Sequence, residues 1–302
     1  MDSSIDKKLC RIDSEISGNK CYESMQHILS LVKRNLLRNK YKESLEILYN
    51  YASIFIEKKE FILAGELMDE YAKVADKGKL FCNIKVINNI ISIFESPWTS
   101  AAFSSTSNDQ KMDDYSVTML LYIKFMNRAI SFSKSETHPH GNPLFHKSIG
   151  RYYIHEKDYV KAQGNLVYSQ DVELLLSMIN EWKKHASEDE HDFFYLRAIL
   201  MLVACGDICN AKCFIYLLDV NLEDPEVPLP IQLAHLLTEA CDPPDEKLFE
   251  KICHVYQPIL DLDPEYKALV KTIRDSYFGH DTGGGLFSGL GGGLSALMRS
   301  FM

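Results

Sequence analysis

The chain has 302 residues, of which 46% are hydrophobic and 25% are charged, and its formal net charge is -9 at pH 7. This composition is typical of a globular protein with enough apolar residues for a sizeable core. The acidic balance argues against a nucleic-acid-binding surface as the main function, because such surfaces carry an excess of Lys and Arg. The eight cysteines lack paired CxxC spacing, which excludes a small secreted disulfide framework and favours the reducing cytosol.

The sequence contains neither a secretory signal nor a membrane-spanning segment that can be recognised. The segment MDSSIDKKLC at the N-terminus lacks the apolar stretch of a secretory signal. The most apolar run, residues 193–205, is too short to span a bilayer and contains Arg197. We therefore expect no direct membrane insertion, and we interpret this run as a buried central helix.

The first third of the chain has a helical pattern. Apolar residues recur three and four positions apart over residues 22–75, which predicts amphipathic helices joined by short turns. A further helix is predicted over 84–94, ending before Pro97 because proline lacks the N–H that a helix interior needs. The polar, serine-rich segment 96–114 is predicted to be a loop.

The remaining two thirds repeat the pattern with interruptions. A helix from about 114 to 133 leads to the segment 134–143, which is rich in helix breakers. Helical pairs follow through residue 184, and the connection 221–230 contains three prolines. The last helices are predicted over residues 231–241, 245–257 and 264–277.

One small motif occurs four times: an aromatic or apolar residue is followed three positions later by a small one, at the start of a predicted helix. Small residues let neighbouring helices approach closely, and such elements recur in stacked helical hairpins. The four pairs are Tyr41/Ser44, Phe61/Ala64, Tyr159/Ala162 and Ile208/Ala211.

These patterns predict an all-α fold, an α-solenoid of TPR-like stacked hairpins with at most one small β-hairpin near residues 219–231. We expect an N-terminal helical half over residues 1–135 and a C-terminal helical half over 136–278. The glycine-rich segment 279–302 follows as a tail, which is either mobile or ordered by a partner.

The sequence offers candidate metal ligands but no convergent set. Cys205, Cys209 and Cys213 are four residues apart, yet no second CxxC or HxxxH follows, so buried packing is the better interpretation. Four histidines near the middle of the chain have no carboxylate or thiolate at a spacing typical of a metal site: His138, His140, His146 and His155. No GxSxG or HExxH motif is found, so we predict no enzyme activity, metal or cofactor.

Two pairs of basic residues near the N-terminus each occupy one helical face, because their members are four residues apart. They are Lys7 with Arg11 and Arg34 with Arg38. Taken alone, the pairs are typical of a solvated surface.

Four segments together resemble a known family. Residues 21–26 (CYESMQ) and 41–55 (YKESLEILYNYASIF) are similar to the opening of the Golgi-to-ER traffic protein 4 family. Residues 142–166 (NPLFHKSIGRYYIHEKDYVKAQGNL) resemble its middle, and 256–279, followed by GGLFSGL, resembles its end. The order and spacing agree over roughly residues 5–300, while the connection 221–230 is shorter than in some relatives.

The resemblance implies a cytosolic α-solenoid without enzyme activity that serves the targeting of tail-anchored membrane proteins to the endoplasmic reticulum. In this family the N-terminal half docks the targeting ATPase, and the C-terminal half holds a ubiquitin-like adaptor protein. Animal relatives also join a large chaperone scaffold. Neither a nucleic acid nor a cofactor is implied.

The family register assigns candidate contacts with the ATPase. Basic positions that face the ATPase fall on Lys7, Arg11 and Arg34, and an acidic regulatory position falls on Glu66. A neighbouring basic position falls on Leu37, with Arg38 beside it. Long, permanently charged side chains of this kind steer association with an acidic partner.

For the adaptor, we expect an apolar segment to be held among the helices of residues 193–277. The end of a solenoid needs a polar cap or a partner, and a concentration of apolar side chains follows the proline-rich connection. These candidate residues are Leu229, Ile231, Leu233, Leu236 and Leu237.

Two other classes of protein compete with this interpretation. One is an unrelated helical-repeat scaffold of a large cytosolic complex, although the terminal winged-helix strands of proteasome-lid-like subunits are not found. The other is an all-helical enzyme, which the absence of converging titratable motifs disfavours.

Overall fold

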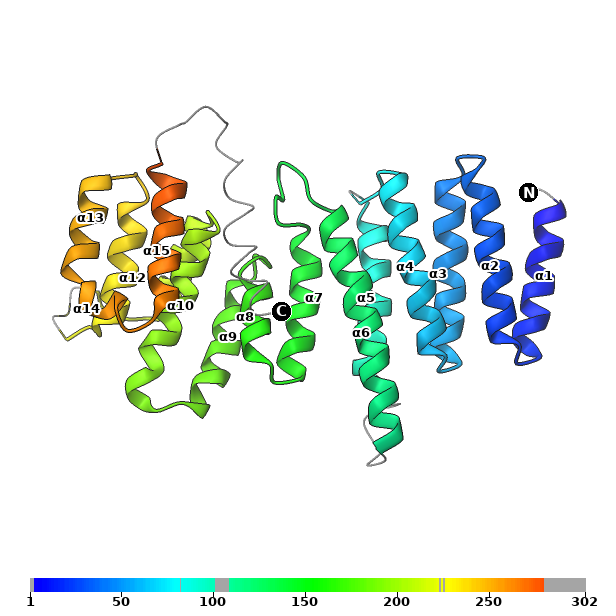
Figure 1. Cartoon of the computed structure of the whole chain (residues 1–302), viewed down its shortest axis with the longest axis horizontal. Helices are drawn as coiled ribbons and strands as arrows, with labels where there is room; N and C mark the ends of the chain where they lie inside the picture. The colour runs from blue at the N-terminus through cyan, green and yellow to red at the C-terminus, as the bar shows by residue number, and fades with distance from the viewer. Residues whose placement is uncertain (1–2, 82, 101–108, 223, 225, 280–302) are drawn as a thin grey trace. The chain divides into compact units, whose positions relative to one another are not determined.

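The computed structural model describes residues 3–81, 83–100, 109–222, 224 and 226–279 (Figure 1). The described residues form fifteen α-helices, two short 3-10 helices and no β-strand, which confirms the predicted all-α class. Contacts divide the chain into two compact units, residues 1–148 (unit 1) and 149–302 (unit 2). Apart from Gly279, the predicted tail lies outside the described residues.

Unit 1 is a row of antiparallel helices in which each helix from α1 to α6 packs against its neighbour in the chain (Figure 1). In addition, α4 packs against both α2 and α6, so these three form one layer. The helices are α1 (Ser3–Ser17), α2 (Cys21–Leu36), α3 (Tyr41–Glu57), α4 (Phe61–Lys77), α5 (Ile84–Thr99) and α6 (Asp109–Phe132), and α7 (Pro143–His155) begins in this unit.

Unit 2 is organised around α10 (His191–Ala204), which packs against α11, α12 and α15. Its residues from Tyr195 to Ala204 are buried except for Arg197, which confirms the buried central helix expected there. The other elements are α8 (Tyr159–Leu166), α9 (Val172–Trp182), the 3-10 helices Lys183–His185 and Glu188–Glu190, α11 (Ile208–Leu217), α12 (Leu229–Ala240), α13 (Glu246–Val255), α14 (Gln257–Leu260) and α15 (Pro264–Tyr277).

The fourfold motif marks helix starts, as predicted. Helices α3, α4, α8 and α11 begin at the first residue of each pair. The small residue three positions later is fully buried in every case, at Ser44, Ala64, Ala162 and Ala211. Each of these helices therefore buries a small side chain in its first turn.

The same turn precedes all four helices. One residue takes a left-handed conformation, with φ of 55° at Asn39, 63° at Lys59, 58° at Lys157 and 82° at Gly206. The next N–H then bonds to the carbonyl five residues earlier, for example from Asp207 to Leu202 at 3.0 Å. This hydrogen bond is that of a Schellman motif, which ends one helix and fixes the direction in which the next begins.

In unit 2 the turn carries an additional cap. The residue after the left-handed position is Asp158 or Asp207, and each carboxylate accepts a hydrogen bond from the N–H three residues later at 3.2 Å. These bonds satisfy N–H groups that have no partner within the helix. The short sequences EKDY and CGDI thus encode both the end of one helix and the start of the next.

We expect the substitutions Gly206→Ala and Lys157→Gly to change stability in opposite directions. A Cβ at Gly206 would meet no atom within 4 Å, so G206A tests backbone conformation alone and should lower the free energy of unfolding by about 1 kcal/mol. K157G removes the strain of a lysine in a left-handed conformation and should raise the free energy of unfolding. The gain should stay below about 1 kcal/mol, because glycine also increases the entropy of the unfolded chain. Urea titration measures both, and equal effects of the same sign would contradict the turn assignment.

The predicted end of the helix before Pro97 is wrong, because α5 continues to Thr99 with Pro97 inside it. Proline cannot donate to the carbonyl of Ile93. The Ser96 hydroxyl donates to this carbonyl instead, at 2.7 Å, so the oxygen keeps a partner and the helix continues. The following helix also begins earlier than predicted, at Asp109, so both ends of the expected loop over 96–114 are helical, and residues 101–108 lie outside the described residues.

The division between the units falls later than the predicted boundary between residues 135 and 136. The start of α7 is tied to unit 1: the Phe145 ring packs edge-on against Phe81 with centroids 6.3 Å apart. The Ser148 hydroxyl also donates to Glu95 at 3.0 Å. In the described part of the 219–231 connection the backbone forms turns, and no β-hairpin is found there.

Candidate partner-binding surfaces

A charged face lies on the first helices of unit 1 and contains the predicted ATPase contacts. We define the charged face as Lys7, Arg11, Arg34, Arg38 and Glu66. All five residues are exposed, and they lie on α1, on α2 or the turn that follows it, and on α4.

Glu15 joins α1 to α2 beside this face. Its carboxylate accepts from Arg11 Nε at 2.9 Å and lies 2.7 Å from His27 Nδ1 on α2. The hydrogen bond with His27, followed by that with Arg11, holds the pKa of Glu15 below its ordinary value. Arg11 is therefore paired with Glu15 on the surface, while most of its side chain stays exposed to solvent. The i,i+4 spacing of Arg11 and Glu15 could have revealed this pair, whereas sequence reasoning missed His27 because only the antiparallel hairpin brings it there.

The pairing of Glu15 with His27 also sets the register of the two helices. Lys7 lies about 12 Å before Glu15 along α1, and Arg34 lies about 10 Å beyond His27 along α2. Because the helices are antiparallel (Figure 1), these distances place Lys7 and Arg34 at the same height. Neither forms an ion pair with another described residue, so both charges are available to a partner.

The end of α2 adds an apolar side chain to the charged face. Leu37, the C-cap residue, is 87% exposed and stands between Arg34 and Arg38 in the sequence. Arginine is enriched in protein interfaces, and an exposed leucine beside it adds apolar area that a partner could bury.

Glu66 lies apart from the basic residues. Helices α2 and α4 run in the same direction (Figure 1), but Arg34 is near the end of α2 while Glu66 is in the second turn of α4. Lys7 and Arg34 therefore share a height across α1 and α2, whereas Glu66 lies near the opposite end of a helix two further along the chain.

On α12, the five residues predicted to bind the adaptor divide into two groups. Ile231, Leu233 and Leu237 are 3%, 0% and 0% exposed and belong to the hydrophobic core of unit 2. Leu229 is 57% exposed and Leu236 is 36% exposed. The first three therefore offer no surface in this conformation, because α12 packs against α10, α11 and α13. Leu229 and Leu236 remain as an exposed pair on the helix.

The row of cysteines is not buried as predicted. Cys209 and Cys213 are exposed on α11, and Cys205 lies at the end of α10. Burial raises the pKa of the Cys205 thiol to about 12. A helix boundary thus separates one thiol from the other two, and in the described part of the chain no three His, Cys, Asp or Glu side chains are placed to hold a metal.

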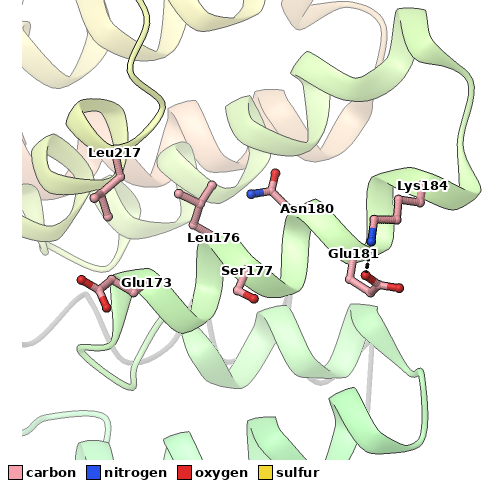
Figure 2. A pocket seen from close by; sticks show the side chains of 7 residues that line it. All are labelled: Glu173, Leu176, Ser177, Asn180, Glu181, Lys184 and Leu217. Carbon is pink, nitrogen blue, oxygen red and sulfur yellow. Dashed lines mark hydrogen bonds and ion pairs between the residues drawn. The ribbon is translucent and has the colours of Figure 1, made fainter.

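A shallow hollow of about 430 Å³ lies on α9 and reaches the end of α11 (Figure 2). Leu176 and Leu217 line its apolar part, and Glu181 is joined to Lys184 at 2.5 Å at one end. That ion pair lowers the pKa of Glu181, so the carboxylate is ionised at neutral pH and is unsuited to act as a general acid. The hollow pairs no nucleophile with a base.

The substitution Glu15→Gln should change how stability depends on pH. The folded pKa of Glu15 lies below its ordinary value of 4.5, so the ionised group stabilises the fold above about pH 4.5, and this contribution is lost as the pH falls through the folded pKa. Urea unfolding of the natural protein and of E15Q should therefore give a difference that shrinks in this acidic range.

Glu43→Gln is the matched control, because Glu43 is exposed and forms no ion pair with the described residues. A difference between the natural protein and E15Q that stayed constant with pH would show that Glu15 does not interact as an ionised group.

The fold and these surfaces define a helical-repeat protein that exposes charged and apolar side chains on its helices. Among the described helices, none has the length and apolar character needed to cross a bilayer. The family model of Golgi to ER traffic protein 4 matches residues 38–302. The chain therefore belongs to the Golgi to ER traffic protein 4 family, as the resemblance indicated.

Individual relatives agree with this assignment. The chain is 24% identical to the Golgi to ER traffic protein 4 homolog of Dictyostelium discoideum, over 96% of this chain and 91% of the relative. It is 22% identical to the Homo sapiens homolog, over 96% of this chain and 86% of the relative. The crystal structure of C. therm. Get4 shares the fold, with a TM-score of 0.70, 16% identity and coverage of 99% of this chain and 96% of that one.

Proposed function

We propose that this chain is a cytosolic scaffold for the delivery of tail-anchored proteins to the endoplasmic reticulum membrane, without enzyme activity or a cofactor of its own. Its membership of the Golgi to ER traffic protein 4 family over residues 38–302 carries the proposal. In this function, unit 1 docks a targeting ATPase and unit 2 holds a ubiquitin-like adaptor, which brings the two partners together on one solenoid. A large chaperone scaffold is a further partner to test for.

Affinity isolation from cytosol, followed by mass spectrometry, tests the whole proposal. Recovery of a targeting ATPase together with a ubiquitin-like protein supports it. Recovery of the subunits of an unrelated large complex, with neither of these partners, would favour the alternative of a general helical-repeat scaffold.

The charged face supports docking of the ATPase in unit 1. Lys7 and Arg34 lie at one height without an ion-pair partner among the described residues, and the exposed Arg11 lies one turn after Lys7 on α1. A cluster of exposed positive charge raises the association rate with an acidic partner, and salt weakens this effect because exposed charges are screened over about 10 Å at 0.1 M.

The double substitution Arg11→Glu with Arg34→Glu should slow association with the ATPase roughly tenfold at low salt and flatten its salt dependence. Stopped-flow fluorescence over a series of salt concentrations measures both effects. The control is the double substitution Lys247→Glu with Lys251→Glu, at exposed positions of α13 in unit 2. It changes the net charge of the chain by the same amount. If both double variants slow association equally, net charge rather than the charged face controls binding.

The exposed pair Leu229 and Leu236 is the part of the predicted adaptor site that supports docking in unit 2. Replacing both leucines by serine should weaken adaptor binding roughly tenfold or more, because each buried leucine side chain contributes about 1.5–3 kcal/mol. Isothermal titration of the purified full-length chain with the adaptor measures the loss. Leu262→Ser, at a leucine that is 66% exposed beyond α14, is the control, and an equal loss in that variant would argue against a site on α12.

A further inference from the structure

A second hollow, of about 420 Å³, lies within unit 1 between the end of α4 and the loop that joins α6 to α7. It is separate from the charged face, since it contains none of those five residues. Its size is within the range of sites that hold one or two side chains of a ligand and is too small for a folded domain.

The floor of this hollow is apolar. Phe81 and Ile87 are buried beneath it, and the Phe132 ring lies 6.3 Å from the Phe81 ring at 55°. Aromatic rings in this tilted arrangement form a stable surface. An apolar side chain placed on them would be removed from water, which favours binding.

The rim is polar and positively charged. Lys79, in the turn after α4, and Lys134, just after α6, both line the hollow and are exposed. Neither lysine forms an ion pair with another described residue. Asp76 contributes the single carboxylate among the lining residues, so the formal charge of the lining is +1 with histidine neutral.

The loop that carries Lys134 is held in place by its own hydrogen bonds. The His138 N–H donates to the Ser135 hydroxyl at 3.1 Å, and this hydroxyl lies 3.0 Å from that of Thr137. The Asn142 N–H donates to Ser133 at 2.8 Å, which ties the end of the loop to α6. The loop and its hydroxyl groups are therefore already ordered, so binding need order only the lysine side chains.

We propose that this hollow binds a short acidic segment of a partner protein, in which an oxyanion stands next to an apolar side chain. The apolar side chain rests on the Phe81 and Phe132 rings, and the oxyanion lies between Lys79 and Lys134. Ammonium groups bind carboxylates and phosphates as point charges, so Glu, Asp and phosphoserine share the required chemistry.

Three fluorescein-labelled peptides of equal length test this with the full-length chain. Each has leucine and phenylalanine at its centre, flanked by glutamate in the first, by phosphoserine in the second and by glutamine in the third. Fluorescence anisotropy should show that at least one charged peptide binds roughly tenfold or more tightly than the glutamine peptide, and the tighter of the two identifies the source of the oxyanion.

Lys79→Gln and Lys134→Gln should each weaken binding of the charged peptide roughly fivefold and reduce its dependence on salt. Lys77→Gln is the matched control, because Lys77 is exposed at the end of α4 and does not line the hollow. The proposal would be overturned if all three peptides bound equally or if all three substitutions had equal effects. It would also be overturned if the chain bound phosphatidylserine vesicles but none of the peptides.

Discussion

Close contact between helices is the constraint on which the rest of the structure depends. A Cβ added at Gly65 on α4 would lie 2.8 Å from both Leu121 and Tyr122 on α6, and one added at Gly150 on α7 would lie 2.5 Å from Leu166 on α8. These distances leave no room for even a methyl group. Helices that approach so closely can also bond directly, as the Tyr122 hydroxyl does to the Phe61 carbonyl at 3.0 Å.

Packing of this kind decides which charges serve the fold and which remain for partners. Asp69 on α4 forms an ion pair with Arg128 on α6, which joins the two helices, and it lies 3.0 Å from Lys73 of its own helix. Lys7, Arg34, Lys79 and Lys134 have no such pairing among the described residues. Paired charges hold adjacent helices in register, whereas the unpaired ones lie on the faces and turns for which we propose binding functions.

Both proposed binding regions of unit 1 depend on the turns. The Schellman turn at Asn39 ends the helix that carries Arg34, and the left-handed residue Lys79 stands in the turn that borders the hollow. Because each turn is fixed by hydrogen bonds of the backbone, the side chains it carries are presented at constant positions along the solenoid. Binding at such positions need order only the side chains, because the backbone that carries them is already fixed.

The sequence determined the local features because they depend on neighbours in the chain. The period of apolar residues predicted the helices, and the four motif pairs marked the exact starts of α3, α4, α8 and α11. The resemblance of four segments indicated the family, which a match over residues 38–302 then showed. The proposed partners and the ATPase contacts remain predictions from that resemblance, and the adaptor-binding leucines remain a prediction from the apolar pattern.

Tertiary structure decided which members of each pattern face outward. The leucines of α12 look alike in the sequence, yet packing against α10 buries Leu233 and Leu237 and leaves Leu229 exposed. Cys209 and Cys213 likewise lie on the outer side of α11. The hollow between α4 and the α6–α7 loop joins residues more than fifty positions apart. Composition and spacing cannot specify such contacts, because they arise only when helices distant in the chain are stacked side by side.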